Sequence, residues 1–87
     1  MINAISRIGP DAAREFPLSE APESIPLRVI GIQSGHGAQS RLASMGILPG
    51  EIVKIVRKGN GGPLLVEVKG TRVALGRGIS LKVIVTI

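Results

Sequence analysis

The single histidine is the side chain of this 87-residue chain most suited to metal chemistry. His36 lies between Gly35 and Gly37, and an imidazole binds a transition metal when cysteines, carboxylates or further histidines converge on it. The chain has no cysteine. The remaining candidate ligands are carboxylates scattered along the sequence: Asp11, Glu20, Glu23, Glu51 and Glu67. Two interpretations of His36 stay open. It is either a weak ligand for a divalent ion, within one chain or shared with a second chain or a partner protein, or an exposed loop histidine.

Nucleophilic and phosphate chemistry is poorly supported. A serine nucleophile needs a base and a group that orients the base, and one histidine without a neighbouring carboxylate does not supply both for any of Ser34, Ser40, Ser44 and Ser80. The glycine-rich segments 59–62 and 76–78 lack the lysine-serine ending and the following helix of phosphate-binding loops. We interpret both segments as turns and expect no enzymatic activity.

The net charge of +5 suggests a basic surface. It is carried by the residues after Phe16, because Arg7 and Arg14 are balanced by Asp11 and Glu15. Such a surface suits nucleic acid, an anionic membrane surface or an acidic protein. Base recognition uses aromatic platforms, and Phe16 is the only aromatic residue, so we expect no nucleic acid. The basic candidates, which serve equally well as a solubilising coat, are Lys54, Arg57, Lys58, Lys69, Arg72 and Lys82.

The chain length and hydropathy pattern predict one small domain. Residues 1–16 have no continuous apolar run, and no later run reaches the ~18 apolar residues that a spanning helix needs. We therefore expect a soluble cytoplasmic protein without an embedded segment. Residues 1–16 show neither helical nor strand periodicity and are predicted to be a mobile extension, and residues 17–87 to be the domain.

The periodicity of residues 17–87 predicts a mainly β domain with one short helix between the first and second strands. The five predicted strands cover residues 27–32, 51–58, 64–69, 72–75 and 82–87. Ala38, Leu42 and Met45 have the spacing of one helical face, with Ser34 as the N-cap and Gly46 as the left-handed residue that ends the helix. Five short strands and one helix fit a small closed barrel, since closure removes unpaired strand edges.

The central hairpin contains the candidate binding surface. If Arg57 lies opposite Leu64, then Val53 and Ile55 pair with Val68 and Val66 on an inner face. On the outer face Lys54 pairs with Glu67, and Val56 pairs with Leu65. This outer pair is either covered by another part of the chain or forms an apolar partner-binding spot with a charged rim. The rim residues are Lys54, Lys58 and Lys69.

A series of short motifs in the second half of the chain carries a family resemblance. In order, they are Arg41-Leu42, Met45-Gly46-Ile47, Pro49-Gly50, Gly62-Pro63, Val66 to Gly70, Ala74-Leu75-Gly76-Arg77-Gly78-Ile79 and Val83 to Val85. Together with Leu18-Ser19-Glu20 and Val29 to Ile32, they resemble the ferrous iron transport protein A (FeoA) family over residues 17–87. Ala21 and Ser24 depart from its pattern, which has a larger apolar residue and a turn glycine there.

The resemblance implies a stand-alone SH3-like barrel in the cytoplasm. It also implies an accessory role in iron homeostasis, in which the protein binds the cytosolic domain of a membrane ferrous-iron transporter that carries a G-protein domain. The alternative is a metal-binding regulatory domain, for Fe²⁺ or Mn²⁺, like the C-terminal domain of metal-dependent repressors. Those repressors have a DNA-reading helix-turn-helix, which does not fit before Pro17. Homo-oligomerisation stays open, and the motif residues Arg41 and Arg77 are candidates for holding backbone carbonyls.

Overall fold

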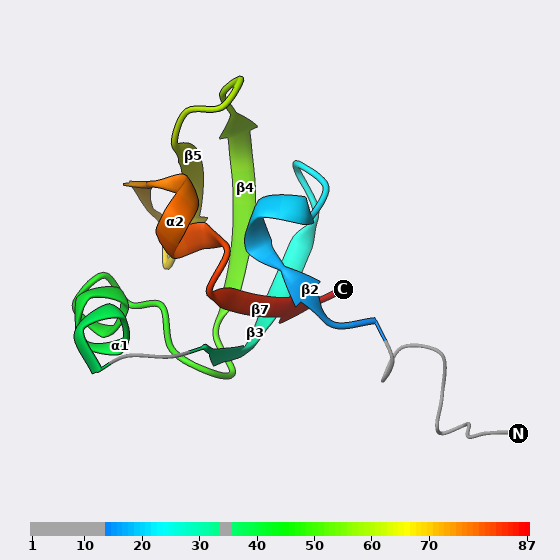
Figure 1. Cartoon of the computed structure of the whole chain (residues 1–87). Coiled ribbons are helices and arrows are strands. Elements are labelled where there is room, and N and C mark those ends of the chain that lie inside the picture. Colours follow the sequence, from blue (N-terminus) through cyan, green and yellow to red (C-terminus); the bar gives the residue numbers. More distant parts are fainter. Residues whose placement is uncertain (1–13, 34–35) are drawn as a thin grey trace, which may run out of the picture.

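The computed structural model describes residues 14–33 and 36–87 (Figure 1). Its elements are β2 (Phe16–Pro17), the 3-10 helix η2 (Leu18–Glu20), β3 (Pro26–Ile32), α1 (His36–Ser44), β4 (Ile52–Lys58), β5 (Leu64–Val68), β6 (Thr71–Leu75), α2 (Arg77–Ser80) and β7 (Val83–Thr86). The predicted fold class, mainly β with one short helix between the first two predicted strands, is confirmed. Each predicted strand is found within one residue of its expected bounds.

The strands form one six-stranded antiparallel sheet in the order β2-β7-β3-β4-β5-β6. β2 is the strand that the sequence does not predict, because it has two residues and one of them is a proline. In the described part of the chain, β2 and β6 are edges, so the sheet is open where a closed barrel was expected. The helical turns that follow the two edge strands, η2 and α2, pack against each other instead (Figure 1).

The tight turn predicted around Arg77 is a single turn of helix, α2. The Ser80 side chain is buried, and its Oγ donates to the Gly76 carbonyl at 2.9 Å. The Ser80 backbone N–H donates to the same carbonyl at 3.0 Å. These two bonds close a helical turn, which the flanking glycines alone did not indicate.

The hydrophobic core lies on the inner face of the sheet and under the helical segments. Its fully or nearly fully buried members are Leu18, Ala21, Leu27, Val29, Leu42, Ile47, Val53, Ile55, Leu64, Val66, Val68, Leu75, Val83 and Val85. Buried and exposed residues alternate along β3 to β5, as expected for strands with one face toward the core. Phe16, which the sequence assigns to the extension, lies in β2 opposite Val85 and packs partly against this core. Most of the predicted extension, residues 1–13, lies outside the described residues.

Helix α1 attaches to the core through the predicted face. Leu42 is fully buried and Met45 is partly buried against the core. Gly46 has φ +87°, so the left-handed helix end is confirmed, and the Ile47 N–H donates to the Leu42 carbonyl at 2.9 Å. The predicted N-cap Ser34 and the side chain of His36 lie outside the described part of the structure.

The register of the β4–β5 hairpin is as predicted only over its first half. Val53 lies opposite Val68, Lys54 opposite Glu67 and Ile55 opposite Val66. A β-bulge follows, so that Arg57 lies opposite Leu65 and Lys58 opposite Leu64. The predicted pairs Arg57–Leu64 and Val56–Leu65 are therefore wrong. The extra residue in the bulge reverses the alternation of side chains, which places Lys58 on the same side as the buried Leu64.

Candidate partner-binding face

The loop before β3 stabilises the bulge. The β3–β4 ladder begins at Pro26 and Lys54, so the remainder of β4 has no strand on that side. The Ser24 N–H donates to the Ile55 carbonyl at 2.8 Å, and the Lys58 N–H donates to Glu23 Oε2 at 2.7 Å. Ser24 adopts φ +69°, which agrees with its position where the family has a turn glycine. These contacts fix the end of β4 that carries Val56.

The outer face of β4, β5 and β6 places apolar side chains beside cations. Val56 and Leu65 are half-buried, and Ala74 lies opposite Leu65 and is exposed. We call these three residues the outer patch. Arg57 lies opposite Leu65 on β4 and is exposed.

A charged row borders the outer patch. Glu67 lies opposite Lys54 on one side and opposite Arg72 on the other. Lys54 and Arg72 are exposed, so the row carries more positive than negative charge. The outer patch is therefore an apolar centre that is bordered by a mainly cationic rim. Many protein-binding surfaces have this composition.

The structure brings together only some of the predicted rim residues. Lys54 and Lys69 line one shallow hollow of about 130 Å³ together with Glu67. Lys69 is tied to Glu51 by an ion pair with an Nζ–Oε2 distance of 3.1 Å. Lys58 does not belong to the rim, because its Nζ donates to the Ser19 carbonyl at 3.2 Å on the inner side of the bulge.

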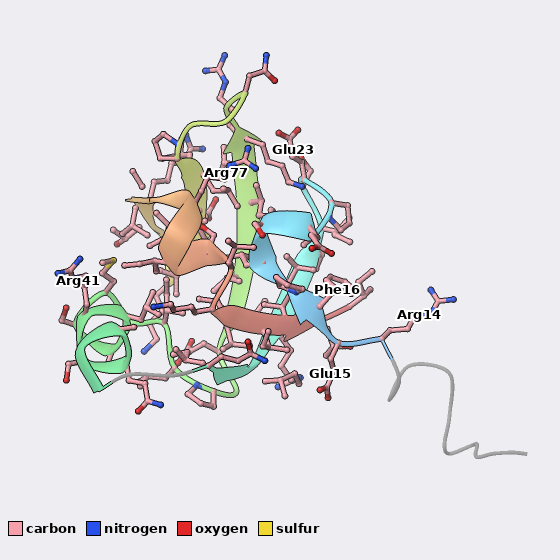
Figure 2. All side chains as sticks on the ribbon, in the orientation of Figure 1. Arg14, Glu15, Phe16, Glu23, Arg41 and Arg77 are labelled. Atoms are coloured by element: carbon pink, nitrogen blue, oxygen red, sulfur yellow. The ribbon has the colours of Figure 1, made fainter. Side chains whose placement is uncertain are left out.

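Arg77 holds the glycine-rich loop between β4 and β5. Its Nε donates to the Gly62 carbonyl at 2.9 Å, and its Nη2 donates to the Gly59 carbonyl at 2.6 Å. Figure 2 shows Arg77 and Glu23 at the same end of β4 as this loop. Arg77 is half-buried and uses its donors on backbone oxygens, so its contacts are structural.

The other motif residues lie at turns or in the core. Arg41 is exposed on α1 and points away from the sheet in Figure 2, and its guanidinium holds no carbonyl of the described residues. Pro49 and Gly50, the latter with φ +94°, form the turn before β4. Gly62 and Pro63 lead into β5. The motif series therefore marks chain turns and core contacts.

The carboxylates that the sequence offers as metal ligands do not converge. In the described part of the chain, no three side chains of the types His, Cys, Asp and Glu lie close enough to hold a metal ion. Glu23 accepts the Lys58 N–H, Glu51 pairs with Lys69, and Glu67 lies between two cations. Glu20 is exposed on η2. Asp11 lies outside the described residues, so the described donor set does not fit a metal site.

The open antiparallel sheet with its two bracing helical turns defines a small SH3-like β domain. The chain belongs to the FeoA family, because the sequence model of the FeoA domain matches residues 16–87. No helix among residues 14–33 and 36–87 is long and apolar enough to span a membrane.

Relatives of known name agree with this assignment. The chain is 41% identical over 70 residues to a protein of Methanocaldococcus jannaschii named "Putative Fe(2+) transport protein A", a match over 80% of this chain and 84% of the relative. A crystal structure of an iron uptake regulatory protein, FeoA, shares 35% identity at a TM-score of 0.78. The match covers 83% of this chain and 96% of that protein. FeoA of Stenotrophomonas maltophilia shares 37% identity at a TM-score of 0.71, over 80% of this chain and 88% of that protein. It was crystallised with zinc and is described as an SH3 domain protein.

The likeness extends to repressors at the level of the fold. A manganese-dependent transcriptional repressor has a TM-score of 0.76 at 17% identity, with 84% of this chain and 41% of the repressor covered. At this identity the likeness shows the fold alone.

Proposed function

We propose that this chain is an accessory protein of ferrous iron uptake that acts by binding the cytosolic part of the membrane ferrous-iron transporter, the part with the G-protein domain. Its membership in the FeoA family and the name of its Methanocaldococcus jannaschii relative support the link to iron transport. The observation that carries the binding role is the outer patch, where Val56 and Leu65 are partly exposed beside Lys54, Arg57 and Arg72.

The outer patch fits a protein partner with acidic groups around an apolar side chain. Apolar area at the centre of an interface contributes most of the affinity, and the charged rim adds specificity and a faster encounter. Under this proposal the protein works in the cytoplasm and catalyses no reaction. Nucleic acid is not the partner under this proposal, since stacking of bases relies mainly on Phe, Tyr and Trp platforms and Phe16 is the one such residue.

The test is a calorimetric titration with the purified cytosolic part of the transporter. The double variant Val56→Thr/Leu65→Thr removes apolar area while keeping β-propensity. We expect binding to weaken by on the order of 1–3 kcal/mol, with thermal stability nearly unchanged. Ile84→Thr is the matched control, since Ile84 is a half-buried β-branched residue on β7 and lies outside the outer patch. Equal affinity of the parent and the double variant would exclude the outer patch as the contact.

Regulation by a bound divalent ion is the second candidate, favoured by the zinc bound in the Stenotrophomonas maltophilia relative. Glu23, Glu51 and Glu67 already have other partners, so His36 is the ligand candidate to test. Calorimetry with Fe²⁺, Mn²⁺ and Zn²⁺, on the parent and on His36→Ala, tests this alternative. Stoichiometric binding that His36→Ala abolishes would support it over the transporter-binding role.

A further inference from the structure

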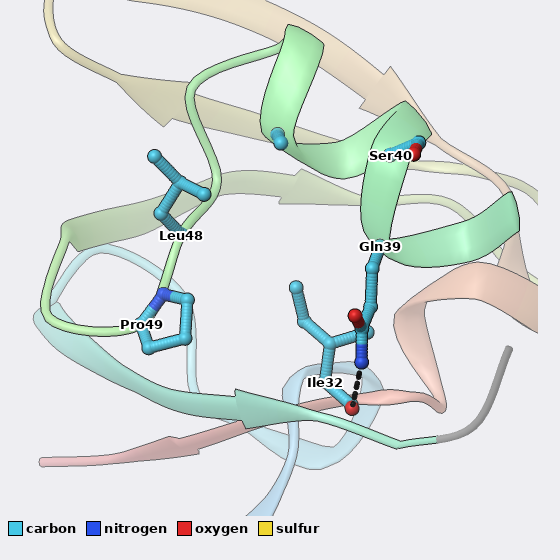
Figure 3. A pocket seen from close by; sticks show the side chains of 6 residues that line it. Ile32, Gln39, Ser40, Leu48 and Pro49 are labelled. Atoms are coloured by element: carbon cyan, nitrogen blue, oxygen red, sulfur yellow. Dashed lines mark hydrogen bonds between the residues drawn. The ribbon is translucent and has the colours of Figure 1, made fainter. Parts of the chain in front are cut away.

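A groove separates α1 from the segment that leads from α1 to β4 (Figure 3). It has a volume of about 330 Å³, and its lining residues are Ile32, Gln39, Ser40, Ala43, Leu48 and Pro49. In Figure 3 Leu48 and Pro49 lie on one side, with Ile32 and Gln39 facing them. None of these residues belongs to the outer patch.

The groove exists because α1 uses a different face for the core. Leu42 and Met45 pack inward, so the face that carries Gln39, Ser40 and Ala43 is turned toward the groove. Small side chains on this helix face leave the space unfilled. Leu48 is 42% exposed. A leucine side chain that stays in water does not contribute the favourable free energy that its burial would give. The volume is at the lower end of the ~300–1,000 Å³ of ligand sites, which suits one or two side chains of a peptide.

Two polar groups at the groove are suited to a peptide backbone. Gln39 Nε2 lies 3.5 Å from the Ile32 carbonyl oxygen, at the outer limit of a hydrogen bond. Gln39 is exposed, so its amide can turn to a ligand at little cost. The Ile32 carbonyl is at the end of β3, where an extended segment finds a backbone acceptor.

A cationic side chain lies next to the groove. Arg28 donates from Nη1 to the carbonyl of Gly50, the neighbour of Pro49, at 3.3 Å. The Arg28 side chain is exposed. No carboxylate of the described residues lines the groove, and the Glu51 carboxylate that follows Gly50 is paired with Lys69.

We propose that this groove binds a short acidic segment of the transporter's cytosolic part, with one branched aliphatic side chain seated on Ala43 between Leu48 and Ile32. The carboxylates of the segment lie toward Arg28, and its backbone meets Gln39. The inference rests on the proposed function for the source of the segment. The acidic and aliphatic character of the segment is inferred from the residues that line the groove and from the charge beside it.

The first experiment is the calorimetric titration with the cytosolic part of the transporter, using variants of exposed groove residues. Leu48→Ala removes one wall, and Ala43→Leu fills the space. Each should weaken binding about tenfold, because both remove the seat of a buried anchor. Leu81→Ala, at a leucine that is 51% exposed elsewhere, is the matched control and should leave the affinity unchanged. Unchanged affinity of both groove variants, in a protein that still binds the transporter, overturns the groove proposal and leaves the proposed function standing.

The charge component has its own pair of variants. Arg28→Glu should weaken binding at least as much as Leu48→Ala, whereas Arg41→Glu, on the side of α1 that points away from the sheet, should leave it unchanged. Equal losses in the two variants would indicate only a general effect of net charge and would overturn the assignment of Arg28 to the groove.

A second experiment is independent of the transporter. The ¹⁵N-labelled protein is titrated with the acetylated peptide Glu-Leu-Asp-Leu-Glu and, as control, with Lys-Leu-Lys-Leu-Lys. The acidic peptide should shift the amide signals of Ile32, Gln39, Ala43 and Leu48, and the basic peptide should not. Absence of shifts, shifts elsewhere, or equal shifts with both peptides overturn the proposed groove chemistry. If the parent does not bind the transporter part, the proposed function fails, and so does the assignment of the bound segment to the transporter. The peptide titration still decides which kind of segment the groove binds.

Discussion

Gly46 offers a quantitative test of how helix α1 ends. Its φ of +87° lies in the left-handed region, where a side chain with a Cβ is disfavoured by about 1–2 kcal/mol. A Cβ built at this position has Val68 Cγ2 and Lys69 Cδ as nearest atoms, both at 3.9 Å, which is ordinary contact. The cost of Gly46→Ala is therefore conformational only, and we expect the free energy of unfolding to fall by about 1–2 kcal/mol.

A second glycine of the same helix provides the control. Gly37 is exposed within α1, and a Cβ there meets no atom within 4 Å. Gly37→Ala should therefore raise the free energy of unfolding by up to about 1 kcal/mol, because alanine has the higher helix propensity. Urea denaturation followed by circular dichroism measures both variants. For a domain of this size, 1 kcal/mol corresponds to a change in Tm of about 4–8 °C. Equal stability of Gly46→Ala and the parent would show that the left-handed helix end is wrong.

Three further predictions concern contacts outside the proposed binding surfaces. Arg77→Ala should lower the free energy of unfolding by about 2 kcal/mol in urea denaturation, because it removes charge-assisted hydrogen bonds to the carbonyls of Gly59 and Gly62. A loss of stability no larger than that of the exposed Arg41→Ala would contradict the role given to these bonds. Ser24→Gly should raise the melting temperature, since a non-glycine residue at φ +69° costs about 1 kcal/mol, and a lower melting temperature would mean that the Ser24 side chain makes a contact that outweighs the strain. Deletion of residues 1–16, the predicted extension, should leave a cooperatively folded domain. That domain should be less stable by about 1–2 kcal/mol, the same loss as we expect for Phe16→Ala, because a half-buried aromatic side chain is lost. Non-cooperative melting of the truncated chain would show that the domain begins earlier.

The parts of the fold that follow from local chemistry could be predicted from the sequence. Alternation of apolar and polar residues located β3 to β7, and the spacing of Leu42 and Met45 located α1. Gly46 followed from its position directly after the last apolar residue of the helix. In each case a few neighbouring residues determine the structure, so the signal is contained in a short window.

The parts that depend on distant contacts could not be predicted. The bulge at Val56 is stabilised by Glu23 and Ser24, more than 30 residues earlier in the chain, and no local pattern marks it. The same bulge turned Lys58 inward, so that it lies apart from Lys54 and Lys69, which line one hollow. The partner-binding role of these three lysines stays a prediction. The groove beside α1 is formed by small side chains and a turn, which have no periodic signature.

One calorimetric series tests whether this protein acts by binding the cytosolic part of the ferrous-iron transporter. The parent protein, Val56→Thr/Leu65→Thr and Ile84→Thr are each titrated into that purified part. We expect saturable binding by the parent and by Ile84→Thr, and affinity lower by on the order of 1–3 kcal/mol for the double variant. Absence of binding by the parent, under conditions where the transporter part is folded and binds its nucleotide, would contradict the proposed transporter-binding role.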